Sequence, residues 1–88
     1  ESHCAAGEHR VQKQFKKLPK QTKQKALARL ELFVADSMDY RLGNHPLAGE
    51  WAGHRSIDIT GDIRAVYKEV DEAIVQFVAI GSHSELYE

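Results

Sequence analysis

Residues 56–68 constrain the fold most, because their side chains alternate between apolar and polar on either side of a Gly-Asp pair. Ile57 and Ile59 alternate with polar residues, and the alternation resumes at Ile63. A period of two that is interrupted by a turn signal predicts a β-hairpin with one buried face.

The length of the connecting loop decides the register of this hairpin, since a slip of one residue moves every side chain to the other face. With a three-residue loop, Ile57 lies opposite Ala65. Asp58 then lies opposite Arg64, on the other face of the hairpin. A two-residue loop would bring Ile59 against Arg64, so we expect the three-residue loop, with an apolar face and a polar face that carries an Asp58–Arg64 pair.

Residues before the hairpin show helical spacing instead. Val11, Phe15 and Leu18 recur at i, i+4 and i+7 from about residue 9, and Pro19 is expected to end that helix. A second helix is predicted over residues 21–35, with Gln21 or Thr22 as its cap. Residues 73–80 form the most apolar segment, and such a strand is usually central or covered on both faces.

This order of elements predicts an α+β fold, in which an N-terminal αα-hairpin packs on one face of a small twisted antiparallel sheet. The sheet would be a three-strand meander, with residues 1–8 as a candidate edge strand. The opposite face of the sheet is then left for function.

Length and composition narrow the class of protein. At 88 residues the chain is expected to be a single domain, residues 1–88, and no run approaches the ~18 apolar residues of a membrane helix. The first eight residues lack the basic start and apolar stretch of a signal peptide, so a cytoplasmic location is expected. Cys4 is the one cysteine, which excludes a disulfide framework and a Cys-rich zinc site.

Charge is distributed unevenly along the chain, although the net charge is only −1. Residues 10–30 contain eight lysines and arginines and no acid, whereas residues 31–88 contain eleven acids and four lysines or arginines. A solvated helix is the ordinary explanation of lysines, but this excess favours contact with a nucleic-acid backbone. The predicted RNA- or ribosome-binding residues are Arg10, Lys13, Lys16, Lys17, Lys20 and Lys23.

Three histidines are candidates for proton transfer, because an imidazole titrates near neutrality. His45 precedes a proline in a loop, His54 begins the hairpin, and His83 follows the last strand. Arg64 in mid-strand suits a bidentate phosphate contact, with an ion pair to an aspartate as the structural alternative. Arg55 has the same two interpretations. The histidines lack the local spacing of metal ligands, so no metal site is predicted.

Two aromatic residues carry open alternatives. Trp51 is expected to close one end of the core together with Leu47, and stacking on a base is the alternative. Tyr87 is next to last in the chain, where packing gives little reason for a tyrosine, so it is a candidate for contact with a base or a sugar.

Five segments together resemble the RelE/ParE toxin superfamily, most of all the YafQ branch of bacterial type II toxin–antitoxin systems. They are Phe15–Pro19, His45–Trp51, Gly53–Ser56, Gly61–Tyr67 and Gly81–Tyr87. The resemblance covers roughly residues 9–88, and it implies a RelE-like fold and an endoribonuclease that cuts mRNA on the ribosome. No metal or other cofactor is implied, since the ribose 2′-hydroxyl attacks the adjacent phosphate.

The resemblance also implies roles for particular residues. His45 matches a loop histidine, Asp62 an acidic residue after the hairpin turn, His83 a catalytic histidine and Tyr87 a terminal aromatic residue. His45 or Asp62 would then be the base and His83 the acid.

One position departs from the family pattern. Asp58 stands where the YafQ pattern has a second histidine, while Arg64 matches an arginine of RelE-like members. We therefore expect Arg64 to stabilise the negative charge of the phosphorane. Either Asp58 holds Arg64 in position, or the activity is attenuated. His54 and Arg55 are expected to support the site.

Two other functions stay open at this point. A ParE-like toxin would poison gyrase and cut no RNA, and a plain RNA- or ribosome-binding module would have incidental histidines. The family resemblance further implies a cognate antitoxin, for which the basic αα-hairpin is a candidate docking surface. The other expected partners are the ribosome and mRNA, with no membrane.

Overall fold

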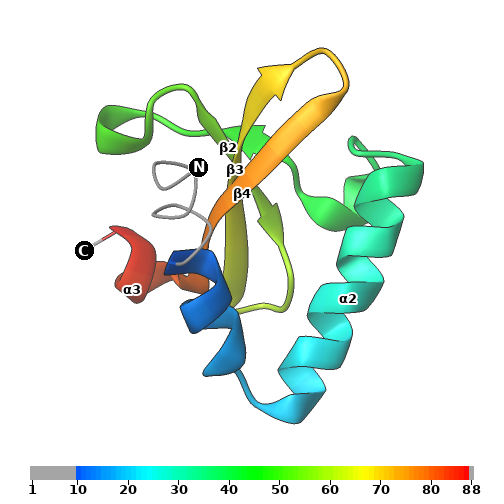
Figure 1. Ribbon diagram of the computed structural model, residues 1–88, viewed down its shortest axis with the longest axis vertical. Helices are drawn as coiled ribbons and strands as arrows, with labels where there is room; N and C mark the ends of the chain where they lie inside the picture. The colour runs from blue at the N-terminus through cyan, green and yellow to red at the C-terminus, as the bar shows by residue number, and fades with distance from the viewer. Residues whose placement is uncertain (1–9, 88) are drawn as a thin grey trace.

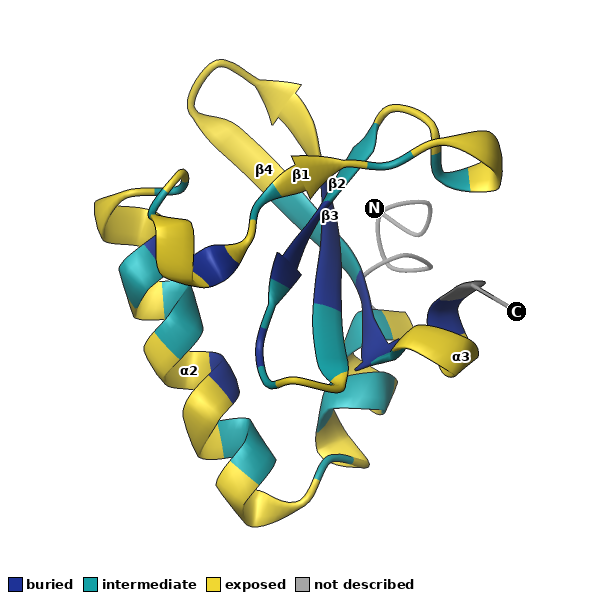
Figure 2. Ribbon diagram, turned by 180° about the vertical axis from the view of Figure 1, so that it is seen from behind, coloured by how far each residue is buried: buried dark blue, intermediate teal, exposed yellow. Residues whose placement is uncertain are grey.

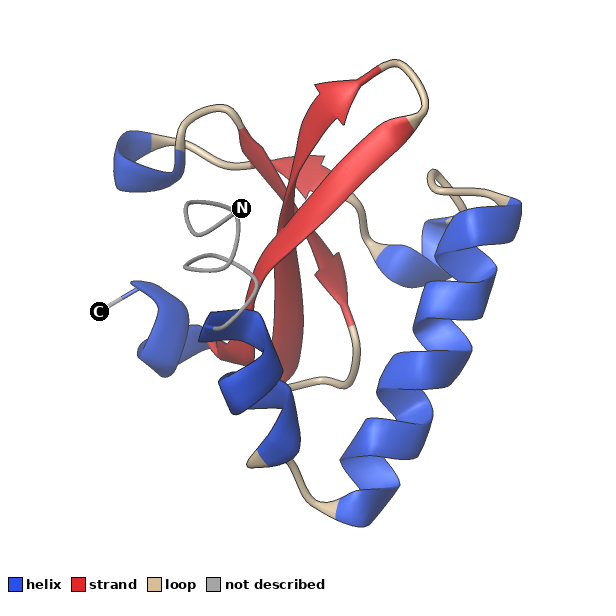
Figure 3. Ribbon diagram, viewed as in Figure 1, coloured by secondary structure: helices blue, strands red, loops and turns tan. Residues whose placement is uncertain are grey.

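The computed structural model of the protein describes residues 10–87. A helix over residues 10–16 and the longer helix α2 (Lys20–Ala35) precede a four-stranded antiparallel sheet, and a short helix, α3 (His83–Tyr87), follows it. Figure 1 shows α2 running alongside the sheet, and Figure 3 shows the same arrangement by secondary structure. The predicted α+β fold is confirmed.

The turn at Pro19 separates the two helices as predicted, but the cap of α2 differs from the prediction. Pro19 itself is the N-cap, and its carbonyl accepts the first intrahelical hydrogen bond from the Lys23 amide at 2.9 Å. No side chain caps this end, so the predicted cap at Gln21 or Thr22 is wrong. Proline suits the position because a helix start needs no amide donor there.

The strands follow one another in space in the order β1 (His45–Pro46), β2 (His54–Asp58), β3 (Ile63–Asp71) and β4 (Ile74–Ser82). The predicted hairpin register is confirmed, since Ile57 pairs with Ala65 and Asp58 with Arg64. The Thr60 hydroxyl accepts hydrogen bonds from the first two amides after Gly61 and so closes the loop. The pairing of β1 with β2 adds a strand to the predicted meander.

Strand β4 is not central, but its second half is covered on both faces, because Ile80 packs in the main core and Ala79 is buried on the opposite face. Among residues 10–87 it lies at the end of the sheet. Ile74 at its start is 54% exposed, whereas Ile80 is buried, and Figure 2 shows the tip of the β3–β4 hairpin as exposed. Gln14 of the first helix covers part of the edge by accepting a hydrogen bond from the Ile80 amide at 2.9 Å. The candidate edge strand in residues 1–8 lies outside the described residues.

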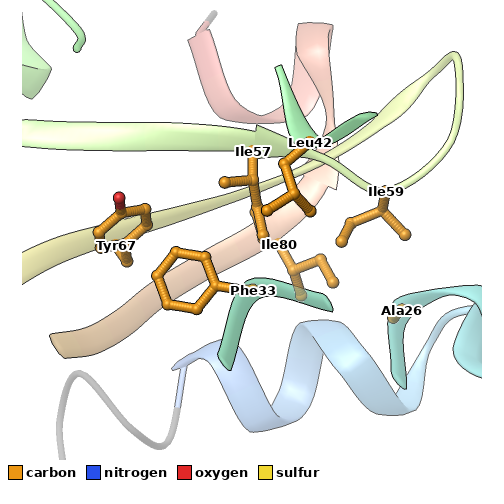
Figure 4. Packing of buried hydrophobic residues seen from close by; sticks show 8 residues of the cluster. Ala26, Phe33, Leu42, Ile57, Ile59, Tyr67 and Ile80 are labelled. Atoms are coloured by element: carbon orange, nitrogen blue, oxygen red, sulfur yellow. The ribbon is translucent and has the colours of Figure 1, made fainter. Parts of the chain in front are cut away.

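The main core lies between the two helices and one face of the sheet, as predicted. Figure 4 shows Phe33 of α2 against Tyr67, with Ile57 and Ile80 beside them. The rings of Phe33 and Tyr67 meet edge to face with centroids 4.9 Å apart. An aromatic pair in this geometry adds about 0.5–1.5 kcal/mol to the burial of its area.

A second, smaller core occupies the opposite face of the sheet. Val66, Ala79 and Leu86 are buried there, with Leu47 and Trp51 packed against them. Trp51 belongs to η2 (Gly49–Trp51), and Leu86 belongs to α3. Trp51 and Leu47 therefore pack against this second core, on the face that was expected to remain open, and not at an end of the main core.

A hydrogen-bonded network holds the segment between α2 and β1. The Asn44 amide donates to the Tyr67 hydroxyl at 2.7 Å and to the Ser37 carbonyl at 2.8 Å. Its side-chain oxygen accepts from Arg55 Nε at 2.7 Å. Because Asn44 directly precedes His45, the network determines where β1 begins.

A second local contact organises η1 (Tyr40–Leu42), just before this network. The Arg41 guanidinium donates to the Asp39 carboxylate at 3.0 Å, and this hydrogen bond lowers the pKa of Asp39 to about 2. Gly43 follows in the left-handed conformation with φ 59°. A Cβ at that position would come within 2.5 Å of the Asp58 carboxylate, so only glycine fits without displacing Asp58.

No helix within residues 10–87 has the length and apolar character that crossing a membrane requires.

Candidate active site

A cavity of about 310 Å³ opens on the sheet face opposite the two long helices. His45, Arg64 and His83 line it, although they are far apart in the sequence. Leu47, Ala48 and Trp51 form the rest of its wall. The cavity therefore combines two imidazoles and a guanidinium with an apolar wall, and we call it the His-Arg pocket.

The short strand β1 brings His45 to this face. His45 pairs with Ser56 of β2, and paired residues of an antiparallel sheet share a face. His45 Nδ1 lies 2.9 Å from the Gly43 carbonyl, which can only accept a hydrogen bond. Nδ1 is therefore the protonated nitrogen, and in the neutral ring Nε2 is left as the proton acceptor.

Strand β3 positions Arg64 opposite Asp58. Arg64 Nη1 donates to Asp58 Oδ1 at 2.9 Å, which confirms the predicted pair. Arg64 Nε is buried and has no hydrogen-bond partner among the described residues. Arg64 also lines the pocket, and a guanidinium suits an anionic ligand because it can bind phosphate through two donors.

The helix α3 presents His83 from its first position. Its start is a capping box: the Ser82 amide donates to Glu85 Oε1 at 2.9 Å, and the Glu85 amide donates to Ser82 Oγ at 3.3 Å. Leu86 is 6% exposed and anchors the helix on the second core. A Cβ at Gly81 would lie 2.8 Å from Glu85 Oε1, so glycine allows the cap to approach the strand.

Asp62 does not line the His-Arg pocket. It is exposed and lies on a different cavity, beside Lys17 and Glu85. The catalytic role predicted for Asp62 stays a prediction, with Asp62 outside the pocket that His45, Arg64 and His83 share. Asp62 precedes Arg64 by two residues, but it belongs to the loop of the hairpin, and its side chain lies on another part of the surface.

Two of the predicted supporting residues occupy different faces. Arg55 pairs with Tyr67 and so shares the face of the main core, where it donates to Asn44. His54 packs edge to face against Trp51, with ring centroids 5.4 Å apart, beside the pocket. The backbone of Tyr87 ends α3.

The predicted RNA-binding cations lie mostly on exposed surface. Five of the six are exposed: Arg10, Lys13, Lys16, Lys17 and Lys20. Lys23 is half-buried, with its ammonium 6.0 Å from the centre of the Phe15 ring. Arg10 differs from the others, because its guanidinium carbon lies 5.8 Å from the centre of the Trp51 ring and so close to the wall of the pocket.

Sequence reasoning missed several residues that shape the site. Ser82 and Glu85 carry the S-x-x-E spacing of a capping box, so a sequence signal for them existed. Asn44 had no such signal, because its partners Ser37, Arg55 and Tyr67 lie 7, 11 and 23 residues away without a motif that joins them. Among residues 10–87, no three His, Cys, Asp or Glu side chains lie close enough together to hold a metal ion.

Comparisons with known proteins agree with this fold. The family described as the bacterial toxin of type II toxin–antitoxin system, YafQ, matches residues 5–88. No curated protein matched the sequence in a direct comparison.

Solved structures with the same fold include toxins from two bacteria. YafQ from Escherichia coli BL21(DE3) superposes with a TM-score of 0.76 at 22% identity, over 90% of this chain and 91% of that one. The E. coli DinJ-YafQ toxin–antitoxin complex gives 0.72 at 24% identity, over 90% of each chain. A copper-bound mutant toxin from Helicobacter pylori gives 0.63 at 26% identity, over 88% of this chain and 90% of that one. Since the family match spans nearly the whole sequence, the chain belongs to the YafQ family of toxins of bacterial type II toxin–antitoxin systems.

Proposed function

We propose that this toxin is an endoribonuclease that cleaves mRNA on the ribosome. The observation that carries the proposal is that His45, Arg64 and His83 line one cavity. Cleavage of RNA by its own 2′-hydroxyl needs a base, an acid and a cationic group near the phosphate. The His-Arg pocket contains one residue suited to each task.

In this reaction the 2′-oxygen attacks the adjacent phosphorus, and the bond to the 5′-oxygen of the next nucleotide breaks. His45 takes the proton of the 2′-hydroxyl through Nε2, since the hydrogen bond from Nδ1 to Gly43 leaves that nitrogen as the acceptor. His83 returns a proton to the leaving 5′-oxygen. The products are a 2′,3′-cyclic phosphate and a free 5′-hydroxyl.

Arg64 stabilises the negative charge that develops on the phosphorane. Asp58 holds Nη1 of the guanidinium, and Arg64 lines the pocket, so its positive charge lies beside a phosphate bound there. Of the two candidate bases, His45 is favoured over Asp62, which lies on another cavity. Tyr87 stays a candidate for contact with the substrate.

Six cations are proposed to hold the backbone of ribosomal or messenger RNA: Arg10, Lys13, Lys16, Lys17, Lys20 and Lys23. Such contacts depend on charge and not on base sequence. The proposed place of action is the cytoplasm, where mRNA is translated.

A cognate antitoxin is the second proposed partner, since related YafQ structures were solved in complex with DinJ. An apolar groove of about 350 Å³ between the two helices, lined by Phe15, Leu27 and Leu30, lies beside the lysines. An acidic segment with apolar anchor residues would complement both features. High salt is expected to weaken the complex, because the charges are exposed.

Primer extension on a translated mRNA tests the proposed activity. The wild-type toxin should give cuts that follow the reading frame, and no cuts in the same mRNA without ribosomes. His83→Ala should lower the rate at least a hundredfold, since general acid–base catalysis contributes about 10²–10⁴. Lys25→Ala on exposed α2 serves as a matched control and should cut at the wild-type rate.

Circular dichroism of each variant separates loss of activity from loss of folding. A folded His83→Ala variant that cuts at the wild-type rate would contradict the assignment of the acid. Toxicity with intact mRNA and trapped gyrase–DNA complexes would instead support the ParE-like function.

A further inference from the structure

Arg10 and Trp51 come together at the edge of the His-Arg pocket, although 40 residues separate them in the sequence. The guanidinium carbon of Arg10 lies 5.8 Å from the centre of the indole ring, within the range of a cation–π contact. Arg10 is exposed, whereas Trp51 is half-buried. The pair therefore has one rigid member and one that solvent reaches.

The indole is held in a defined orientation. Trp51 Nε1 donates to the Leu86 carbonyl at 3.2 Å, and the His54 ring meets the indole at an interplanar angle of 88°. The side chain also packs against the small core that contains Val66. A ring that is fixed from several sides binds a planar ligand with little loss of conformational entropy.

The composition of the pocket divides it into two parts. Arg64 and the two histidines supply the charged part, and Leu47, Ala48 and Trp51 supply the apolar part. A phosphate has no favourable contact with the apolar part. A nucleobase does, because every base has an apolar face that stacks on an aromatic ring.

We propose that Trp51 and Arg10 form a nucleotide subsite for single-stranded RNA beside the scissile phosphate. Trp51 stacks on the base, and Arg10 pairs with the phosphate of the same nucleotide. Arginine suits this position, since its guanidinium both stacks on aromatic rings and binds phosphate oxygens. The inference rests on the proposed function, because it takes the substrate of the pocket to be RNA.

The single tryptophan makes the subsite directly measurable. Trp51 is the one tryptophan of the chain, so fluorescence excited where the three tyrosines do not absorb reports on its surroundings alone. The probe is a six-nucleotide single-stranded RNA with 2′-O-methyl groups throughout, which binds and cannot be cleaved. The wild-type protein should show saturable quenching, and the same oligonucleotide with abasic positions should quench weakly.

Variants at Arg10 provide the decisive comparison. Arg10→Ala should weaken binding of the probe about tenfold, and Arg10→Lys should fall between it and the wild type because it keeps the charge. Lys25→Ala removes an equally exposed cation from α2 and should stay within twofold of the wild type. Equal binding by Arg10→Ala and Lys25→Ala, or equal quenching by the abasic probe, would overturn the proposal.

Two further measurements separate this inference from the proposed function. Trp51→Phe, followed by anisotropy of a labelled probe, should bind several-fold more weakly, and unchanged affinity would count against stacking. The second measurement is primer extension with the wild-type toxin. Quenching that depends on Arg10 in a toxin that cuts no mRNA would leave the subsite standing and refute the endoribonuclease function.

Discussion

Replacing Asn44 by alanine should destabilise the protein more than any other single change to a polar side chain near the site. The substitution removes three hydrogen bonds, to Tyr67, Ser37 and Arg55. Two join neutral groups and contribute about 1 kcal/mol each, and the bond from the guanidinium contributes about 1.5–3 kcal/mol. Their sum, about 3.5–5 kcal/mol, is an upper bound.

Solvent reduces this figure, because it can reach some of the groups left behind. Ser37 and Arg55 are half-buried and can bind water in the variant, whereas Tyr67 is 2% exposed and its hydroxyl is cut off. We therefore expect the free energy of unfolding to fall by about 2–3 kcal/mol. For a chain of this size, that corresponds to a melting temperature lower by roughly 10–20 °C.

Urea unfolding followed by tryptophan fluorescence measures the loss, and Asn44→Asp is the matched control. An aspartate still accepts from Arg55, and it can accept from the Tyr67 hydroxyl, to which the Asn44 amide donates in the wild type. It loses the donor to Ser37, so about half of the destabilisation is expected. A double-mutant cycle of Asn44→Ala with Tyr67→Phe should give a coupling energy of about 1 kcal/mol. A loss below about 0.5 kcal/mol in Asn44→Ala would refute the reasoning, because it would be no larger than that of an ordinary surface substitution.

Three further predictions follow from local contacts. Gly43→Ala should lower the free energy of unfolding by about 1–3 kcal/mol, since φ is 59° and the new Cβ would meet Asp58; an unchanged urea midpoint would show that Asp58 moves aside freely. The hydrogen bond from Arg41 lowers the pKa of Asp39 from 3.8 to about 2, so this carboxylate stabilises the fold above about pH 4 and stops doing so as the pH falls towards 2. A carbon-13 titration of Asp39 should give that pKa as its midpoint, and a midpoint near 3.8 would contradict the contact. The free energy of unfolding of Asp39→Asn should fall less steeply than that of the wild type as the pH is lowered. Glu85→Ala should slow mRNA cleavage several-fold because it loosens the start of α3, whereas Glu85→Gln keeps the cap. Equal cleavage rates for the two variants would show that catalysis does not depend on the cap.

The elements that sequence reasoning predicted correctly are those with a periodic or local signal. The hairpin register followed from the alternation of Ile57 and Ile59 and from a single choice of loop length. The Asp58–Arg64 pair followed in turn, because cross-strand neighbours are determined once the register is known. The helix boundary near Pro19 rested on backbone sterics, which are equally local.

The arrangement of the site needed the tertiary structure. β1 is two residues long, so it has no periodicity to detect, and it exists because β2 offers an edge to pair with. The apolar composition of residues 73–80 could not reveal that β4 lies at the end of the described sheet, since composition does not give strand order. Asp62 shows the same limit, because two residues of separation along a turn can lead to two different cavities.

The sequence by itself determined the fold class, the hairpin and the chemical types available for catalysis, since each depends on neighbours along the chain. Only the tertiary structure decided which of those groups meet. It joined His45, Arg64 and His83 in one pocket, set Asp62 apart and placed Arg10 against Trp51. The physical reason is that these contacts form between segments distant in sequence, and packing of the sheet against its helices and loops, not local preference, brings such segments together.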